Sequence, residues 1–322
     1  MQSSKRAMAR VRVACVLVAV AALCIVLRRI GLDRLQDAFQ SMRVGWFLAA
    51  VMLYGLLFLP AALRWHIALD LTGNAVSVGT SVRLSIIGHF LYTILFGAAG
   101  GDTAKSALYA RWHQRPLAEI LAASSVDRLL GFGGLALLGG SAFIVGALNR
   151  GFEGFESLSL RSPWWWVAGV VIVAIIAGVL LRFGAAPFVQ QFLRALVESG
   201  RKLLLTPGRF AGGILCGLGV QLALSGVLAL NLQAVSHEPV PWLRMAWTFP
   251  VITVISALPI SVAGLGVRES AAFVLFGLCQ VAEEDAVAAA LLTATASLVW
   301  MVIGGFLLWL EAARRQQPQG AG

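Results

Sequence analysis

The sequence has few charged residues and lacks the motifs of the common enzyme classes. Only 12% of its 322 residues are Asp, Glu, Lys or Arg, whereas soluble domains carry about 25%. It contains no HExxH, P-loop or nucleophile-elbow motif. Its four cysteines lie inside apolar runs without CxxC spacing or a histidine partner, so we expect neither a disulfide framework nor a metal site. We therefore do not expect a soluble enzyme, and no cofactor is indicated.

Apolar residues make up 59% of the chain and occur in long runs. Within lipid, such runs can satisfy their backbone hydrogen bonds only as helices. Six uninterrupted runs are candidate spans: residues 13–27, 46–67, 120–148, 164–181, 210–235 and 286–310. We therefore predict an all-α polytopic membrane protein in which residues 1–322 form a single integral membrane domain.

Further apolar runs are short or interrupted by glycine and proline. They cover residues 85–99, 242–257 and 271–278. Such runs are poor spans but typical of re-entrant segments. If residues 83–115 form one hairpin and residues 242–280 another, each half of the chain contains two spans, a hairpin and a third span. We therefore expect about six full spans plus two re-entrant hairpins in an inverted repeat, with halves 11–148 and 164–310, an arrangement typical of transporters.

The distribution of basic residues predicts the orientation in the membrane. With two hairpins and a cytoplasmic N-terminus, the inner side receives twice as many Lys and Arg residues as the outer side, as the positive-inside rule requires. A model with nine crossings and an external N-terminus gives the same balance. We expect a multi-pass protein of the inner cell membrane, whose net charge of +10 reflects topology rather than binding to nucleic acid.

Ionisable residues inside apolar segments mark candidate functional sites, because each costs about 2.5 to 3.5 kcal/mol at a helix centre. The first set follows the first interrupted run and consists of Gly100, Gly101, Asp102 and Lys105. Paired glycines permit a tight break with exposed backbone, and the acid and base lie one helical turn apart. The alternative is an ordinary loop in which Asp102 caps a helix.

The second set is the adjacent pair Asp127 and Arg128, near the beginning of a long apolar run. Neighbouring helical side chains point about 100° apart, so these two need not pair with each other. Each is expected to find a partner elsewhere, with Lys105, Asp102 or a substrate as candidates. The alternative is an intramembrane ion pair that only fixes helix packing.

The third set lies at the second interrupted segment. It consists of Pro259, Ser261, Gly264, Gly266, Arg268 and Glu269. Pro259 removes a backbone donor, and the glycines permit non-helical geometry. Arg268 begins the next apolar run, and its planar guanidinium can bind two oxygens of a phosphate. The alternative for Arg268 is a side chain that extends to the membrane interface from a helix end.

Two other features predict positions at the inner interface. We expect Arg64, His66 and Arg83 to lie there as ordinary interfacial residues. In residues 188–198 apolar side chains recur with helical spacing, and polar side chains occupy the opposite face. This pattern predicts an amphipathic helix lying in the plane of the interface.

The motifs of the three sets resemble those of the lysylphosphatidylglycerol synthase transmembrane-region family, a group of flippase-like integral membrane proteins. The matching residues are Gly97 with Gly100, Gly101, Asp102 and Lys105, then Asp127 and Arg128, then residues 258–261 and 264–269. In multidomain members the membrane part is thought to flip an aminoacylated phospholipid made by a soluble synthase domain. This chain has no room for that domain, so the resemblance implies lipid handling without aminoacyl transfer.

Together these features predict a lipid translocase for an anionic phospholipid or a polyprenyl-linked lipid, rather than an enzyme. Lys105 and Arg268 would hold the headgroup, and the other charged residues of the three sets would balance one another. The expected partners are membrane lipids and a lipid-biosynthesis enzyme or glycosyltransferase. Two alternatives remain: an intramembrane lipid-modifying enzyme with Asp102 or Glu269 as base, and a scaffold for lipid or glycolipid biosynthesis.

Overall fold

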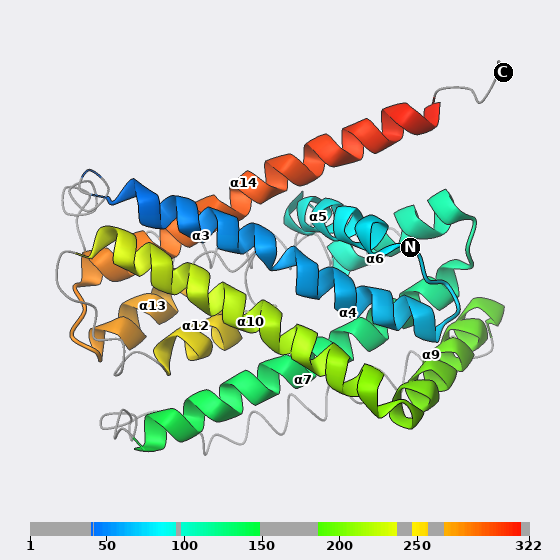
Figure 1. Cartoon of the computed structure of the whole chain (residues 1–322), viewed down its shortest axis with the longest axis horizontal. Coiled ribbons are helices and arrows are strands. Elements are labelled where there is room, and N and C mark those ends of the chain that lie inside the picture. Colours follow the sequence, from blue (N-terminus) through cyan, green and yellow to red (C-terminus); the bar gives the residue numbers. More distant parts are fainter. Residues whose placement is uncertain are drawn as a thin grey trace, which may run out of the picture.

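A computed structural model of the chain describes residue 40 and residues 42–94, 98–148, 186–236, 247–256 and 267–316. All regular structure in these ranges is helical, as the sequence predicts. The helices are α3 (Val44–Leu56), α4 (Phe58–Leu71), α5 (Val78–Ile94), α6 (Ala98–His113), α7 (Leu117–Leu148), α9 (Pro187–Leu205), α10 (Pro207–Val235), α12 (Thr248–Ser256), α13 (Val267–Gly277) and α14 (Glu283–Gln316). Figure 1 shows the longest of them lengthwise in one bundle, with the short helices between them.

Four helical stretches are long and apolar enough to cross a membrane. They are Val44–Leu71, Leu117–Val145, Pro207–Val235 and Glu283–Arg315. Each coincides with one of the six predicted spans, and large apolar side chains such as Leu137 and Phe306 are exposed along them. Exposed apolar side chains are what lipid contact requires. The structure therefore supports a polytopic membrane protein. The predicted spans 13–27 and 164–181 lie outside the described residues.

The first of these spans contains a proline within one continuous apolar stretch. α3 ends at Leu56 and α4 begins at Phe58, and Leu57 between them keeps helical dihedral angles (φ −60°, ψ −24°). Pro60 has no N–H to donate to the carbonyl of Leu56, so one helical hydrogen bond is missing at this point. α3 and α4 together form one span, Val44–Leu71, which contains the predicted span 46–67.

Contacts at both ends show that the α3–α4 span and α10 are antiparallel. The backbone N–H of Arg43, before α3, donates to the carbonyl oxygen of Ala234 near the end of α10 over 2.8 Å. At the opposite end, Arg209 at the start of α10 lies 2.7 Å from the carboxylate of Asp70 near the end of α4. The first described spans of the two predicted halves therefore run in opposite directions.

The end of the bundle that carries α9 also holds the start of α7 and the end of α14. Asn74 Nδ2, just after α4, donates to Glu119 Oε2 on α7 over 2.9 Å. Arg315 on α14 donates to the carbonyl oxygen of Trp112 on α6 over 3.2 Å. We call this end, on the right in Figure 1, the α9 end.

The chain leaves α4 and enters α7 at the same end, so α5 and α6 together return it to its starting side. The short helices α12 and α13 lie towards the other end of the bundle (Figure 1). An inverted repeat predicts that the short helices of the two halves lie towards opposite ends of the bundle, as they do here. Re-entry of these helices into the membrane and the total number of spans stay predictions.

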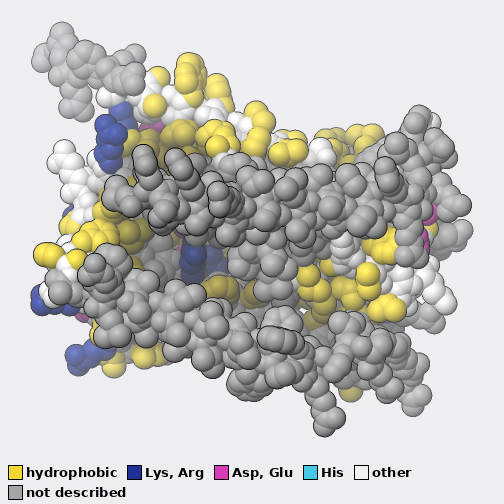
Figure 2. Space-filling model, turned by 180° about the vertical axis from the view of Figure 1, so that it is seen from behind, with side chains coloured by type: hydrophobic (Ala, Val, Ile, Leu, Met, Phe, Trp, Pro, Cys, Tyr) yellow, Lys and Arg dark blue, Asp and Glu magenta, His cyan; other side chains and the backbone are white. Residues whose placement is uncertain are grey.

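Charge is distributed unequally between the two ends. Figure 2, seen from behind, shows most of the visible Lys and Arg side chains at the α9 end. Basic residues on the helices and connections of this end are Arg83, Arg111, Arg115, Arg194, Arg201, Lys202, Arg209, Arg314 and Arg315. The opposite end has Arg43 before α3 and the acidic residues Glu283, Glu284 and Asp285 in the first turn of α14. By the positive-inside rule, this distribution predicts that the α9 end faces the cytoplasm.

Candidate functional site

A cavity of about 400 Å³ lies in the middle of the bundle, and residues from both predicted halves line it. The first half contributes α3 to α7, and the second contributes α10, α12, α13 and α14. Its charged lining residues are Arg64, Asp102, Lys105, Asp127, Arg128 and Arg268. The structure thus brings charged members of all three predicted sets to one cavity, although they are far apart in the sequence.

The remaining predicted residues do not line this cavity in the described part of the chain. Glu269 lies in the first turn of α13 and is fully buried beside the lining residue Arg268. Gly100 and Gly101 lie on α6. The other predicted residues, Pro259, Ser261, Gly264 and Gly266, lie outside the described residues.

The prediction of a helix break at Gly100 and Gly101 is wrong. α6 begins at Ala98, so both glycines lie inside the helix. A Cβ atom at Gly101 would lie 2.5 Å from the Cα atom of Tyr92 on α5. Gly101 therefore permits close packing of α5 on α6. Asp102 also lies inside α6, which excludes the alternative that its carboxylate caps the helix.

Asp127 forms a buried, two-pronged ion pair with Arg64 on α4. The Arg64 Nε donates to Asp127 Oδ1 over 2.7 Å, and Nη2 donates to Oδ2 over 3.2 Å. The two side chains are only 14% and 10% exposed. Gly131, one turn further along α7, leaves room for the guanidinium, since a Cβ there would lie 2.6 Å from Arg64 Nη1.

Sequence reasoning missed Arg64 as a site residue and assigned it to the inner interface. In the structure Arg64 lines the central cavity. The signal was present, because Arg64 lies inside the predicted span 46–67 and a charge within a span is a functional candidate. Its partner could not be read from the sequence, because Asp127 is 63 positions away.

Arg128 pairs with Asp102, as the sequence analysis anticipated. Arg128 Nε lies 2.9 Å from Asp102 Oδ2, and the side chains are 38% and 34% exposed. Because Asp127 and Arg128 are adjacent on a helix, they point in different directions. One therefore reaches α4 and the other α6.

Lys105 is buried beside this second pair. Its Nζ lies 4.0 Å from Asp102 Oδ1 and 4.3 Å from the centre of the Trp65 ring. A cation over an indole ring is a favourable arrangement. A Cβ at Gly88 on α5 would lie 2.8 Å from Lys105 Cδ, so this glycine makes room for the lysine stem.

The described residues that line the cavity carry more positive than negative charge. Four cationic side chains line it, against the two carboxylates of Asp102 and Asp127. If the neighbouring buried Glu269 is included, one positive charge still remains in excess. Charge interactions are strengthened where water is scarce, so the cavity favours an anionic group.

The uncharged wall of the cavity contains a serine and a histidine in contact with each other. His89 Nε2 lies 3.1 Å from Ser297 Oγ and 3.2 Å from the Ser297 carbonyl oxygen. Nε2 donates to the carbonyl oxygen in the tautomer that carries its proton there, and it accepts from the serine hydroxyl in the other. Tyr54 donates to the same Ser297 Oγ over 3.1 Å. Among the described residues, no group of His, Cys, Asp and Glu could hold a metal ion.

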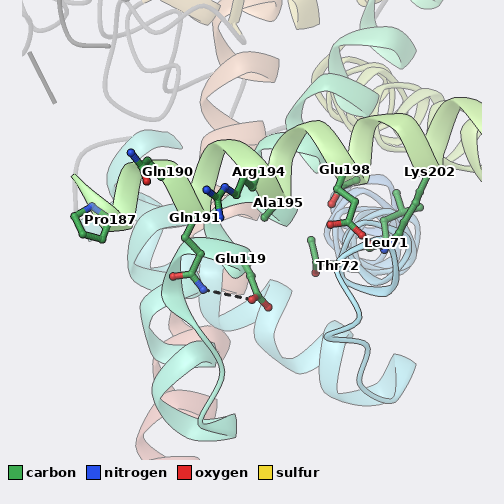
Figure 3. Close-up of a pocket in the computed structure, with 11 residues that line it drawn as sticks. Leu71, Thr72, Glu119, Pro187, Gln190, Gln191, Arg194, Ala195, Glu198 and Lys202 are labelled. Carbon is green, nitrogen blue, oxygen red and sulfur yellow. Dashed lines mark hydrogen bonds and ion pairs between the residues drawn. The ribbon is translucent and has the colours of Figure 1, made fainter. Parts of the chain in front are cut away.

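The predicted amphipathic helix is present as α9. Most of its polar side chains are exposed, and several of them line an open pocket of about 410 Å³ next to Glu119. Figure 3 shows Gln191 directed at Glu119, and its Nε2 donates to Glu119 Oε1 over 3.4 Å. Lys202 Nζ lies 2.8 Å from Glu198 Oε1, and this hydrogen bond lowers the pKa of Glu198. Apolar residues such as Val197 are exposed, as an interfacial helix requires.

Comparison with known proteins identifies a family to which the chain belongs. A search of curated proteins finds no match. The family model described as "Lysylphosphatidylglycerol synthase TM region" matches residues 10–305, which include every residue that lines the central cavity. The chain therefore belongs to the lysylphosphatidylglycerol synthase transmembrane-region family.

Proposed function

We propose that this protein is a lipid translocase that holds an anionic lipid headgroup in the central cavity. The observation that carries the proposal is the excess of positive charge on the cavity wall. Two of the four cations, Arg64 and Arg128, are paired with Asp127 and Asp102. A bound phosphate would balance the positive charge that these carboxylates leave over.

The chemistry of the cavity favours a phosphate group on a lipid. Arg268 on α13 offers a planar guanidinium for two phosphate oxygens, and Lys105 on α6, in the other predicted half, offers a point charge. The cavity lies between spans that face lipid along their length. Lipids are therefore the anions most available to it, with phospholipids and polyprenyl phosphates as the two chemical classes.

The arrangement of the helices supports movement of the headgroup between leaflets. α6 belongs to the first predicted hairpin and α13 to the second, and both contribute charge to the cavity. Transporters built from inverted halves place the substrate between the halves near the middle of the bilayer. Rocking of the two halves would expose the cavity first to one leaflet and then to the other. We propose that the protein lies in the inner cell membrane and that its α9 end faces the cytoplasm.

A transport assay with vesicles tests this function. Purified protein is reconstituted with fluorescently labelled phosphatidylglycerol or phosphatidylcholine, and lipid that reaches the outer leaflet is bleached by dithionite. We expect the wild type to expose the anionic lipid faster than empty vesicles do, and Arg268→Gln to remove that gain. Arg209→Gln is the matched control, because Arg209 pairs with Asp70 outside the cavity. Equal rates for wild type and Arg268→Gln would contradict the proposal.

The same samples separate transport from chemical modification. Lipid recovered after the assay is analysed by chromatography and mass spectrometry. A translocase returns the labelled lipid unchanged, whereas a lipid-modifying enzyme returns a product of different mass.

A further inference from the structure

A second pocket of about 350 Å³ adjoins the central cavity between α6, α7 and α9. It shares two lining residues with the cavity, Asp102 and Arg128. On its far side it is lined by Phe188 and Phe192 of α9. The Asp102–Arg128 ion pair therefore lies on the boundary between the two spaces.

This ion pair is suited to exchange one of its partners. It has a single close contact of 2.9 Å, and both side chains are about one third exposed. Partly exposed ion pairs contribute less to stability than buried ones. A phosphate that reached Arg128 could take the place of the Asp102 carboxylate, and Lys105 lies 4.0 Å from that carboxylate as a second cation.

The position of the pocket suits a lipid rather than a free anion. α9 exposes apolar side chains, with Phe188 48% exposed. Such a helix lies at the boundary between headgroups and acyl chains. The surrounding α9 end carries most of the Lys and Arg residues that the structure describes, and these attract anionic lipids. An acyl chain could lie against the phenylalanines while its phosphate faced Arg128.

We propose that the α6–α7–α9 pocket admits an anionic phospholipid from the leaflet at the α9 end, with its phosphate replacing Asp102 at Arg128 before it enters the central cavity. This inference rests on the proposed function and names the route by which the substrate enters. The pocket thus holds the phospholipid before translocation, and Arg128 selects for negative charge.

Photocrosslinking of lipid tests this site directly. p-Benzoylphenylalanine replaces Phe192 in the full chain, which is reconstituted in vesicles of phosphatidylglycerol and phosphatidylcholine, irradiated and analysed by mass spectrometry. The same replacement at Phe306, exposed on the α14 span, reports the bulk lipid. We expect adducts at position 192 to be enriched several-fold in phosphatidylglycerol, and adducts at position 306 to follow the bulk composition. Bulk composition at both positions would overturn the inference.

Further variants show whether Arg128 is responsible. Arg128→Gln should abolish the enrichment at position 192, and Asp102→Asn should increase it by removing the competing carboxylate. Arg209→Gln should leave it unchanged, because Arg209 lies outside both spaces. Enrichment that survives Arg128→Gln would assign the selectivity to another group and overturn the inference.

The result is independent of the transport assay. If lipid enrichment depends on Arg128 but no lipid crosses the bilayer, the pocket binds phospholipid and the proposed translocation is wrong. If transport depends on Arg268 but adducts at position 192 match the bulk lipid, translocation stands and the lipid enters by another route.

Discussion

The two ion pairs that α7 forms, one with α4 and one with α6, use the same chemical groups in different surroundings. Arg64 and Asp127 make two hydrogen bonds and are almost fully buried. Asp102 and Arg128 make one close contact and are partly exposed. Asp127 and Arg128 are adjacent on α7, yet the first lies in a buried ion pair and the second in a partly exposed one.

This difference assigns the pairs different roles. Loss of one partner from a buried pair leaves an uncompensated charge, which strongly destabilises a protein. A partly exposed pair can open because other groups can replace either partner. We infer that the Arg64–Asp127 pair fixes α4 against α7, and that the Asp102–Arg128 pair is free to exchange with a ligand.

The largest effect is expected from Asp127→Ala, which leaves the guanidinium of Arg64 buried without its carboxylate. The free energy of unfolding should fall by about 3 to 5 kcal/mol. Unfolding of the detergent-solubilised protein by a denaturing detergent, followed by circular dichroism, measures the change. The double variant Arg64→Ala and Asp127→Ala should lose less than the sum of the two single variants. Strict additivity would show that the two side chains are not coupled.

A smaller loss is expected from Gly101→Ala, which tests the helix packing that supports the exposed pair. The new methyl group would meet the backbone of Tyr92, and overpacking of this kind costs about 1 to 3 kcal/mol. Gly140→Ala on α7 is the matched control, because no other atom lies within 4 Å of a Cβ there. The control should be neutral or slightly stabilising, since alanine favours a helix over glycine. Equal losses for both variants would point to a helix-wide effect.

Four of the six predicted spans coincide with long apolar helices, because the free energy of placing a residue in lipid depends mainly on its own side chain. Partners and breaks depend on neighbours that are distant in the sequence. Gly101 lies inside a helix and packs closely against Tyr92, a contact between two helices that the paired glycines alone did not reveal. Asp102 was a foreseeable partner for Arg128, since both belong to predicted sets. Arg64 was missed as a site residue.

The candidate site was predicted in part for the same reason. Charged residues in apolar segments were recognised one by one, and the structure places several of them around one cavity. Its aromatic wall, including Tyr54 and His89, gave no distinct signal, because aromatic residues occur throughout spans. Only the packing of α3 and α5 brings these rings to the cavity.

The smallest change in stability is expected from Asp102→Asn, which removes the carboxylate of the exposed pair and keeps its shape. The free energy of unfolding should change by less than about 1 kcal/mol, because partly exposed ion pairs contribute little and the buried Lys105, 4.0 Å from Asp102, keeps its contact with the Trp65 ring. Asp127→Asn, measured in the same denaturing detergent, provides the comparison within the buried pair and should cost several times more. If both substitutions cost the same, the Asp102–Arg128 pair also holds the fold together. A phosphate could then not displace Asp102 without loosening α6 from α7, and entry through the α6–α7–α9 pocket would require movement of the whole helix.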